Sequence, residues 1–300
     1  MTFFFLDITK LNLVISTKFM NTSQIGIIAL IVANVLLSYK GFQDRSFFRS
    51  YLFSPGAILV NKEYKRLITS GFLHVNWTHL FFNMFTLYSF GGLLFQLLGP
   101  IQFFLIYFVS LIGGNVLSLL INRNDRHYTA VGASGAVSGV LFSTIAVHPN
   151  IGIGMFLIPV SIPGWLFGIL FMLYSVYGMQ KGNDNIGHEA HIGGAILGLL
   201  TTLALYPYLF SAEPLIIMAM LVPAIIFLFY TVKRTSVSSN THTGSTHPNN
   251  ETIDDVYNAK REAERMEIDR ILDKINAKGR DSLTKEEEEE LRTYSERHKN

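Results

Sequence analysis

Seven long runs without a charged residue constrain this chain more than any other feature of its sequence. A bilayer core about 30 Å thick needs about 20 apolar residues in a helix, because each residue adds about 1.5 Å. The runs cover residues 21–39, 79–98, 101–121, 129–147, 164–179, 190–209 and 214–232. The stretch 151–163 contains Pro159 and Pro163, which favour a loop or an interfacial piece over a helix. The runs therefore predict an all-α, polytopic membrane helix bundle.

Charge divides the chain into parts. Residues 251–300 hold 11 of the 24 Lys and Arg and 15 of the 22 Asp and Glu. Residues 233–250 are rich in Ser, Thr and Asn, the composition of a flexible linker. Residues 1–20 carry charges and have no small-residue cleavage site, so they do not resemble a signal peptide. We therefore expect an N-terminal extension at 1–20, a membrane domain at 21–232, a linker at 233–250 and a charged tail at 251–300.

The tail has the pattern of a small helical hairpin. Apolar residues recur near helical spacing from Val256 to Ile275, and Thr284 and Glu287 have the spacing of a capping box. The glutamates at 286–290 favour a solvated helix face over a binding site. The tail has no pattern of basic and aromatic residues typical of nucleic-acid binding, so we expect no nucleic-acid partner.

Polar side chains within the apolar runs form the first candidate site. Such groups are costly in lipid and therefore mark a protein interior or a water-filled cavity. His79 and Asn83 are four residues apart, on one face of a helix, and His74 lies just before them. An imidazole beside a carboxamide can donate hydrogen bonds to a developing oxyanion. The alternative is a hydrogen bond between helices that only stabilises the bundle.

A second group surrounds Ser134 in the stretch VGASGAVSG. Gly132 lets the backbone turn, and Ser134 is expected near the start of a helix, where free amides and the helix dipole favour negative charge. Its own N–H could then serve as an oxyanion donor. The alternative is close packing of helices, because Gly135, Gly139 and Ser143 recur every four residues.

The third group lies at the start of the run 190–209. His191 stands in a pattern in which Ala190, Gly194 and Gly198 recur every four residues. Two faces of small residues can pack closely enough for a hydrogen bond between Ser134 and an imidazole. That imidazole can take the serine proton and return it to a leaving amine.

A metal site is a weaker interpretation of the same stretch. His188, Glu189 and His191 resemble the zinc helix H-E-x-x-H, but the two histidines are three residues apart where that helix needs four. The chain has no cysteine, which excludes thiolate metal ligands, disulfides and a cysteine nucleophile. We expect neither a metal nor a cofactor.

In this order the three groups resemble the rhomboid family of intramembrane serine proteases, over about residues 40–207. The family pattern is H-x4-H-x3-N, then G-x-S-G, then A-H-x2-G-x3-G, on three helices. It is met here by His74, His79, Asn83, Gly132, Ser134, Gly135, Ala190, His191, Gly194 and Gly198. The resemblance implies a six-helix core, to which the run 214–232 adds a seventh membrane helix.

The resemblance also implies a role for each residue. Ser134 would be the nucleophile and His191 the general base of a two-residue centre. The oxyanion hole would consist of His79, Asn83 and the amide of Ser134. Structural positions of the motifs would be His74, Arg66, Gly132, Gly135, Gly194 and Gly198.

Two of the departures from the family pattern bear on the predicted site. Lys65 precedes Arg66 where the family has a tryptophan, and Ser138 stands where an aromatic residue often stacks on the catalytic histidine. The second departure leaves the orientation of His191 open. Glu189 would project about 100° away from its neighbour around the helix, so it receives no triad role.

The implied activity is endopeptidase cleavage of single-span membrane proteins within the lipid bilayer by a Ser–His dyad. We expect a multi-pass protein of a cell membrane, the bacterial inner membrane. One alternative is a catalytically inactive rhomboid-like protein that binds membrane clients. A second alternative is a transporter or channel, in which the occurrence of the three motifs in this order would be a coincidence.

Charge and family disagree about the side of the membrane on which the site opens. Loops 40–78, 122–128 and 180–189 carry nine Lys and Arg, whereas the opposite loops between the runs carry none. The positive-inside rule therefore places the site in the cytoplasm. The resemblance implies an outward-facing site, which we expect because much of 40–78 would be folded at the membrane surface. A seventh crossing would put the tail on the same side as the site.

Overall fold

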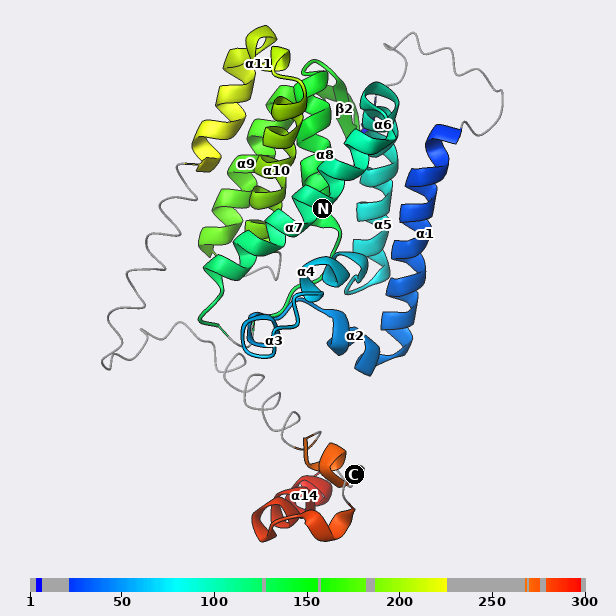
Figure 1. The fold of residues 1–300 in the computed structure, drawn as a ribbon, viewed down its shortest axis with the longest axis vertical. Helices are drawn as coiled ribbons and strands as arrows, with labels where there is room; N and C mark the ends of the chain where they lie inside the picture. The colour runs from blue at the N-terminus through cyan, green and yellow to red at the C-terminus, as the bar shows by residue number, and fades with distance from the viewer. Residues whose placement is uncertain are drawn as a thin grey trace, which may run out of the picture. The chain divides into compact units, whose positions relative to one another are not determined.

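A computed structural model describes most of the membrane part of the chain and a portion of the tail. The described residues are 4–6, 22–125, 128–155, 158–181, 187–225, 268, 270–275 and 279–297. The expected linker 233–250 and most of the expected extension 1–20 lie outside them. The chain divides into two compact units, Met1–Thr241 and His242–Asn300. Helices dominate the first unit (Figure 1), which confirms the all-α membrane bundle.

The helices of the first unit follow the predicted apolar runs. The long ones are α1 (Thr22–Gln43), α5 (Trp77–Thr86), α6 (Gly92–Leu98), α7 (Pro100–Ile121), α8 (Ser134–Val147), α9 (Gly164–Lys181) and α10 (His188–Leu205). A π-helical turn, Leu87–Gly91, joins α5 to α6. After α11 (Tyr208–Ala212), a last apolar helix covers Pro214–Ile225. Residues 226–232 of the seventh run lie outside the described residues.

Two helices are shorter than the runs that predicted them. α8 begins only at Ser134, because the residues before it follow a non-helical path on which Gly132 has a φ of 136°. α10 ends at Leu205, since Pro207 disfavours helical backbone at Tyr206. An apolar run indicates that its residues are shielded from water. It does not mark the residues at which the helix begins and ends.

The stretch 151–163 forms a small antiparallel sheet. β2 (Gly152–Met155) pairs with β3 (Ile158–Pro163), and β1 (Phe4–Leu6) completes the order β1-β2-β3. β3 contains the two prolines and lies at an edge of the sheet, where the missing N–H groups are tolerated. The expectation that this stretch is not helical is confirmed. The sequence did not predict that it forms paired strands.

Three helices among the described residues are long and apolar enough to cross a membrane: Ile25–Gln43, Trp77–Leu98 and Pro100–Ile121. Shorter apolar helices cover Ser134–Val147, Gly164–Met179 and Pro214–Ile225. These lengths agree with a membrane bundle. The number of seven crossings stays a prediction.

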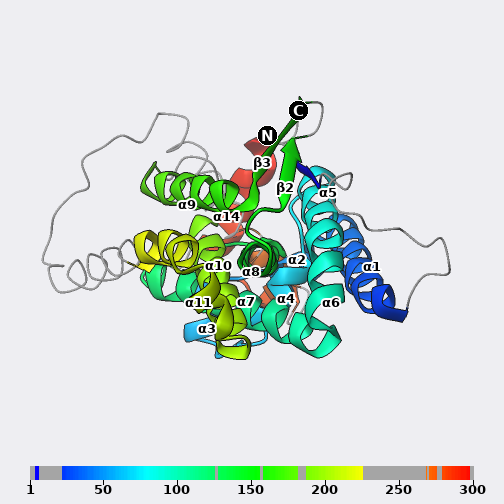
Figure 2. The same ribbon diagram turned by 90° about the horizontal axis from the view of Figure 1, so that it is seen from above.

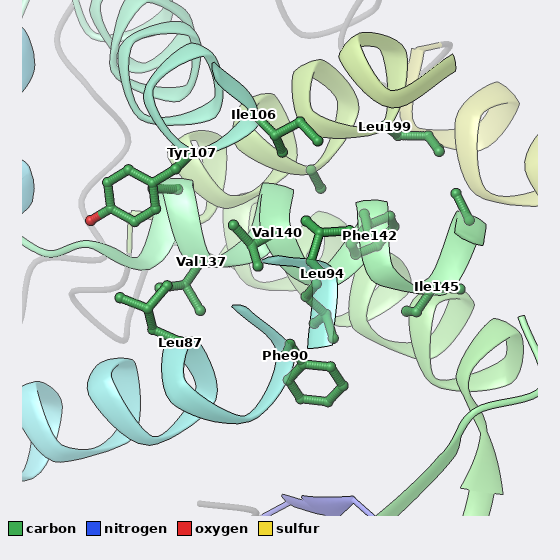
Figure 3. Close-up of a cluster of buried hydrophobic side chains, with 14 of the residues drawn as sticks. Leu87, Phe90, Leu94, Ile106, Tyr107, Val137, Val140, Phe142, Ile145 and Leu199 are labelled. Carbon is green, nitrogen blue, oxygen red and sulfur yellow. The ribbon is translucent and has the colours of Figure 1, made fainter. Parts of the chain in front are cut away.

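α8 lies in the middle of the first unit, seen nearly end-on between α10, α7 and α6 in Figure 2. All of its residues from Gly135 to Ala146 are buried. Leu87 and Ile106, from the two neighbouring spans, lie with Val137 in this core (Figure 3). The 14 residues of α8 extend about 21 Å, which is less than the thickness of a bilayer core of about 30 Å. A helix of this length starts or ends below a membrane surface.

The connection from α1 to α5 is folded. It contains α2 (Arg45–Tyr51), α3 (Pro55–Leu59), α4 (Arg66–Thr69) and the 3-10 turn Ser70–Phe72. Figure 1 shows α2, α3 and α4 at the end of the bundle opposite α11. The ammonium of Lys40 lies 4.3 Å from the ring centre of Phe47, and that of Lys65 lies 5.2 Å from the ring centre of Tyr51. These cations are therefore part of a packed structure and not of a free loop.

The second unit, taken by itself, is a small helical structure. A helical stretch covers 270–275, a 3-10 turn covers Arg280–Ser282, and α14 covers Lys285–Arg297. The capping box is confirmed, because the N–H of Thr284 donates to the carboxylate of Glu287 at 2.8 Å and the N–H of Glu287 donates back at 3.3 Å. Glu287 is buried and also accepts from Arg270 and Lys274, so the solvated-face prediction is wrong for this glutamate. Residues 251–267 lie outside the described residues.

Candidate active site

Ser134 is the first residue of α8, directly after a turn that only glycine fits. Gly132 has a φ of 136°, which L side chains rarely adopt, and its N–H donates to the carbonyl oxygen of Ser70 at 3.0 Å. A Cβ on Gly132 would lie 2.8 Å from Cε1 of His79 and 3.5 Å from Oγ of Ser134. Gly132 therefore keeps open the space between this imidazole and the serine hydroxyl.

The start of α8 offers free hydrogen-bond donors. The first N–H groups of a helix have no partner within it, and the N-cap residue Ala133 makes no side-chain capping bond. Negative charge on a substrate oxygen would be stabilised there by these N–H groups and by the helix dipole. The amide of Ser134 is at this end of the helix, and its role as an oxyanion donor stays a prediction.

α8 and α10 approach each other through their small residues. A Cβ on Gly194 would overlap the carbonyl oxygen of Gly135, and one on Gly198 would lie 2.5 Å from Cα of Gly139. No side chain larger than a hydrogen atom fits at either position unless the helices separate. The predicted close contact between the two small-residue faces is confirmed.

This contact brings the turns that carry the predicted dyad together. The carbonyl oxygen of Ala190, next to His191, lies 3.1 Å from where a Cβ of Gly135 would stand, and Gly135 follows Ser134. The ring of His191 lies 6.0 Å from that of Phe171 in α9, tilted by 33°. Phe171 thus supplies from α9 the aromatic neighbour that the family often supplies from the helix of the nucleophile. The hydrogen bond between Ser134 and His191 stays a prediction.

His74 is fully buried and lies against the turn before Ser134. Its Nδ1 is 2.9 Å from Oγ of Ser38, and its Nε2 is 3.5 Å from the N–H of Ala133. Because Ser38 donates to the carbonyl of Phe72, we place the proton of His74 on Nδ1, where it donates to Ser38. Burial lowers the pKa of His74 to about 3, so the ring is neutral at physiological pH. This arrangement suits a structural residue.

His79 and Asn83 lie together on α5, beside the turn before Ser134. The rings of His74 and His79 meet edge to face at 5.0 Å, and Nε2 of His79 lies 3.0 Å from the Cβ position of Gly132. The carboxamide of Asn83 donates one N–H to the carbonyl of His79 at 3.0 Å, which leaves its second N–H for another acceptor. His79 therefore borders the space beside Ser134, and Asn83 follows it one turn later on α5.

Arg66 organises the connection between α1 and α5. It is 8% exposed, donates to the carbonyl oxygens of Arg49 and Leu52 at 2.8 and 2.7 Å, and pairs with Glu63 at 2.7 Å. The tryptophan missing at Lys65 is not needed for these bonds. The role of Arg66 is consistent with the structural position that the resemblance implies.

His188, Glu189 and His191 do not converge on one point. The ring of His188 meets those of Tyr174 and His191 edge to face at 5.4 and 5.9 Å, whereas the carboxylate of Glu189 accepts a hydrogen bond from Tyr128. Among the described residues, no three His, Asp or Glu are grouped so that they could hold a metal ion. The stretch is therefore better explained by separate roles of its three residues.

Comparison with known proteins assigns the chain to a family. A model of the Rhomboid domain matches residues 61–208. YdcA of Bacillus subtilis, whose name assigns it to the rhomboid proteases, is 33% identical over 148 residues, 47% of this chain and 67% of YdcA. The chain belongs to the rhomboid family. All predicted site residues of this rhomboid, from Arg66 to Gly198, lie within the matched segment.

Two further relatives of this rhomboid are mitochondrial. RHOMBOID-like protein 12 of Arabidopsis thaliana is 29% identical over 193 residues, 58% of this chain and 56% of the relative. Rhomboid protein 1 of Saccharomyces cerevisiae is 32% identical over 150 residues, 48% of this chain and 43% of the relative. The chain thus spans about half the length of these relatives. The comparisons support a membrane protein, and they do not support our expectation of the bacterial inner membrane.

The tail of this rhomboid matches a separate family. A model of a family of unknown function, DUF6576, matches residues 251–297. The match begins beyond the Rhomboid domain and attaches no function to the tail.

Proposed function

We propose that this rhomboid is an intramembrane serine endopeptidase that uses Ser134 and His191 as a catalytic dyad. The observation that carries the proposal is the turn at Gly132, which opens the space between His79 and the Ser134 hydroxyl at the start of α8. The close contact of α8 with α10 supports it, because that contact brings the turn of His191 to the same place.

The proposed reaction has two stages. Oγ of Ser134 attacks the substrate carbonyl carbon while His191 takes the hydroxyl proton, and the carbonyl oxygen becomes an oxyanion. His79, Asn83 and the amide of Ser134 stabilise that charge. The C–N bond then breaks as His191 gives its proton to the leaving amine. Water, deprotonated by His191, then attacks the acyl carbon, the bond from that carbon to Oγ of Ser134 breaks, and His191 returns the proton to Oγ.

The proposed substrates are single-span membrane proteins. Because α8 is shorter than a bilayer core is thick, Ser134 can lie below the membrane surface, within reach of a transmembrane segment. A helical substrate hides its carbonyls in intrahelical hydrogen bonds, so the cleaved segment must unwind locally.

Cleavage of a single-span reporter panel in reconstituted vesicles tests the proposal. We expect Ser134→Ala and His191→Ala each to abolish cleavage nearly as completely as the double variant, because the two residues act as a unit. His79→Ala and Asn83→Ala should each lower the rate on the order of 10-fold to 1,000-fold, as expected for loss of one oxyanion donor. Reporters that bind but are never cleaved would favour the alternative, an inactive rhomboid-like protein that binds membrane clients.

A further inference from the structure

Glu189 is a buried carboxylate two residues before His191, in the first turn of α10. It is 6% exposed, and a buried carboxylate is costly unless hydrogen bonds satisfy it. Its Oε1 accepts from the hydroxyl of Tyr128 at 2.5 Å, from the carboxamide of Asn122 at 2.7 Å and from the hydroxyl of Ser118 at 3.2 Å. All three donors are neutral, and the negative charge also lies at the favourable end of the α10 dipole.

The three donors belong to α7 and to the connection from α7 to α8. Ser118 lies in the last turn of α7, Asn122 directly follows the helix, and Tyr128 precedes Ser134 by six residues. Asn122 is itself held by a bond to the carbonyl of Ser118 at 3.0 Å. One carboxylate oxygen therefore joins the start of α10 to the segment that leads into α8.

The segment from Tyr128 to Gly132 is attached along its length. The ring of Tyr128 meets that of Phe53 edge to face at 6.0 Å. Ala130 exchanges two backbone hydrogen bonds with Phe53 at 3.0 and 3.2 Å, and Gly132 donates to Ser70. The bond between Tyr128 and Glu189 is therefore one of several attachments that hold the segment leading to Ser134, and it is the one that joins this segment to α10.

The proton of the Tyr128 hydroxyl stays in place. Burial, and then the negative charge of Glu189, raise the pKa of Tyr128 well above its ordinary value. The hydroxyl therefore remains a donor throughout the physiological range. A bond to an ionised acceptor is stronger than one between neutral groups.

We infer that Glu189 is a positioning residue of the proposed protease. Through Tyr128, its carboxylate fixes the start of α10, and with it His191, relative to the segment that carries Ser134. This inference rests on the proposed function. Glu189 does not act on the substrate, and it leaves the dyad without a third catalytic member.

A positioning role predicts a particular kinetic change. Misplacement of reacting groups by about 1 Å can cost on the order of 100-fold in rate. Binding of a small probe near the active site does not depend on the distance between Ser134 and His191. Weakening the bond between Glu189 and Tyr128 should therefore lower the maximal rate and leave probe affinity unchanged.

Saturation kinetics with a fluorophosphonate, measured on the full chain in detergent, test the inference. Oγ of Ser134 attacks phosphorus, an O–P bond forms, the P–F bond breaks, fluoride leaves and His191 takes the hydroxyl proton. We expect Glu189→Gln and Tyr128→Phe each to lower the maximal rate by about 10-fold to 100-fold with an unchanged half-saturating concentration. The double variant should lose less than the product of the two single losses, because both changes weaken one bond.

Tyr107→Phe is the matched control. Tyr107 is a fully buried tyrosine of α7 outside the Glu189 cluster, and its substitution also removes one hydroxyl. It should react like the wild type. Equal rate losses in Tyr107→Phe and Tyr128→Phe would overturn the inference, because they would indicate a general effect on the bundle.

The remaining outcomes separate this inference from the proposed function. Wild-type protein that reacts at Ser134, with Glu189→Gln and Tyr128→Phe reacting equally fast, overturns the inference and leaves the protease intact. Wild-type protein that does not react overturns the proposed function itself. If Glu189→Gln does not fold, Tyr128→Phe decides the matter, because it removes one oxygen atom and keeps the ring on Phe53.

Discussion

Gly132 shows how one residue sets the geometry beside a proposed nucleophile. Its N–H is held by Ser70, its φ is 136°, and the space beside its Cα borders both His79 and Ser134. The G-x-S-G spacing predicted a turn here. Only the structure shows that the same glycine also makes room for the imidazole.

Substitution of Gly132 by alanine should therefore damage both stability and reactivity. An alanine held at this φ lowers the free energy of unfolding by about 1–3 kcal/mol, and its Cβ would clash with the ring of His79. We expect a lower unfolding temperature and a fluorophosphonate reaction slowed by more than the loss of folded protein accounts for.

Gly92→Ala is the control for this substitution. Gly92 begins α6, and a Cβ there would meet no atom within 4 Å. Alanine in a helix should stabilise the protein by about 0.5–1 kcal/mol and leave the reaction unchanged. Equal behaviour of the two alanine variants would contradict the role of Gly132.

His74 should make the protein less stable in acid. Its native pKa is about 3, whereas an unfolded histidine has its ordinary value of 6.5. Between these values the unfolded state binds a proton that the native state does not. The stability that neutral, buried His74 contributes is therefore complete above pH 6.5 and is lost as the pH falls toward 3. The free energy of unfolding should decrease by about 1.4 kcal/mol per pH unit in that window.

Unfolding of wild-type protein and His74→Gln across pH 3–7 measures this contribution. Glutamine does not titrate there, so the variant should show a shallower decrease. The same slope in both proteins would mean that His74 is not buried as a neutral ring. Exposed carboxylates contribute equally to both proteins and cancel in the comparison.

At the residue scale, the sequence predicted types of chemistry better than particular neighbours. His79, Ser134 and His191 were found because polar groups are rare in apolar runs, and His74 was found because it completes the family pattern before His79. Phe171 was not, because a phenylalanine among other apolar residues carries no signal. Glu189 was weighed as part of a zinc motif and by its angle on α10, because its donors Ser118, Asn122 and Tyr128 come from a part of the chain more than 60 residues earlier.

At the scale of elements, the contact between α8 and α10 is the feature on which the site depends. Repeated small residues predicted it on both helices, and the structure confirms it at Gly135 with Gly194 and at Gly139 with Gly198. The helix ends were less predictable, because Thr129 to Ala133 are as apolar as the helix that follows them. Their path is set by backbone bonds to Phe53 and Ser70, which no local pattern reveals.

Gly194→Ala should separate these helices. The new methyl group would overlap the backbone of Gly135, which cannot rotate away as a side chain can. We expect a loss of about 1–3 kcal/mol in unfolding free energy and little reaction with a fluorophosphonate. Leu200→Ala, at a 40% exposed position of α10, is the control and should react normally. A stable, reactive Gly194→Ala would contradict the proposed dependence of the dyad on this contact.

At the scale of the whole molecule, charge and family predict opposite sides of the membrane for the site. Six of the nine cations that oppose an outward-facing site lie in residues 40–78, which comprise the end of α1, its connection to α5 and the start of α5. Lys40 and Lys65 pack on aromatic rings there, and Arg66 is buried among carbonyls. Folded cations of this kind are not the free loop charges that the positive-inside rule counts, so we keep the outward-facing expectation.

Single cysteines decide the topology, because the chain has none of its own. We would place one at Asn124, an exposed position in the α7–α8 connection, and one at Ser245, outside the described residues. Labelling of both by a membrane-impermeant maleimide in intact cells is the expected result. Labelling of Asn124→Cys alone would mean that 214–232 does not span, and labelling of neither before lysis would mean that the charge rule is right.

The most direct measurement for the central claim is the position of a covalent adduct. Purified protein treated with a fluorophosphonate should carry one phosphonyl group, located at Ser134 by mass spectrometry of its peptides. Ser134→Ala and His191→Ala should carry none under the same conditions. An adduct at Ser138, persistent labelling of Ser134→Ala, or wild-type protein without any adduct would contradict the account.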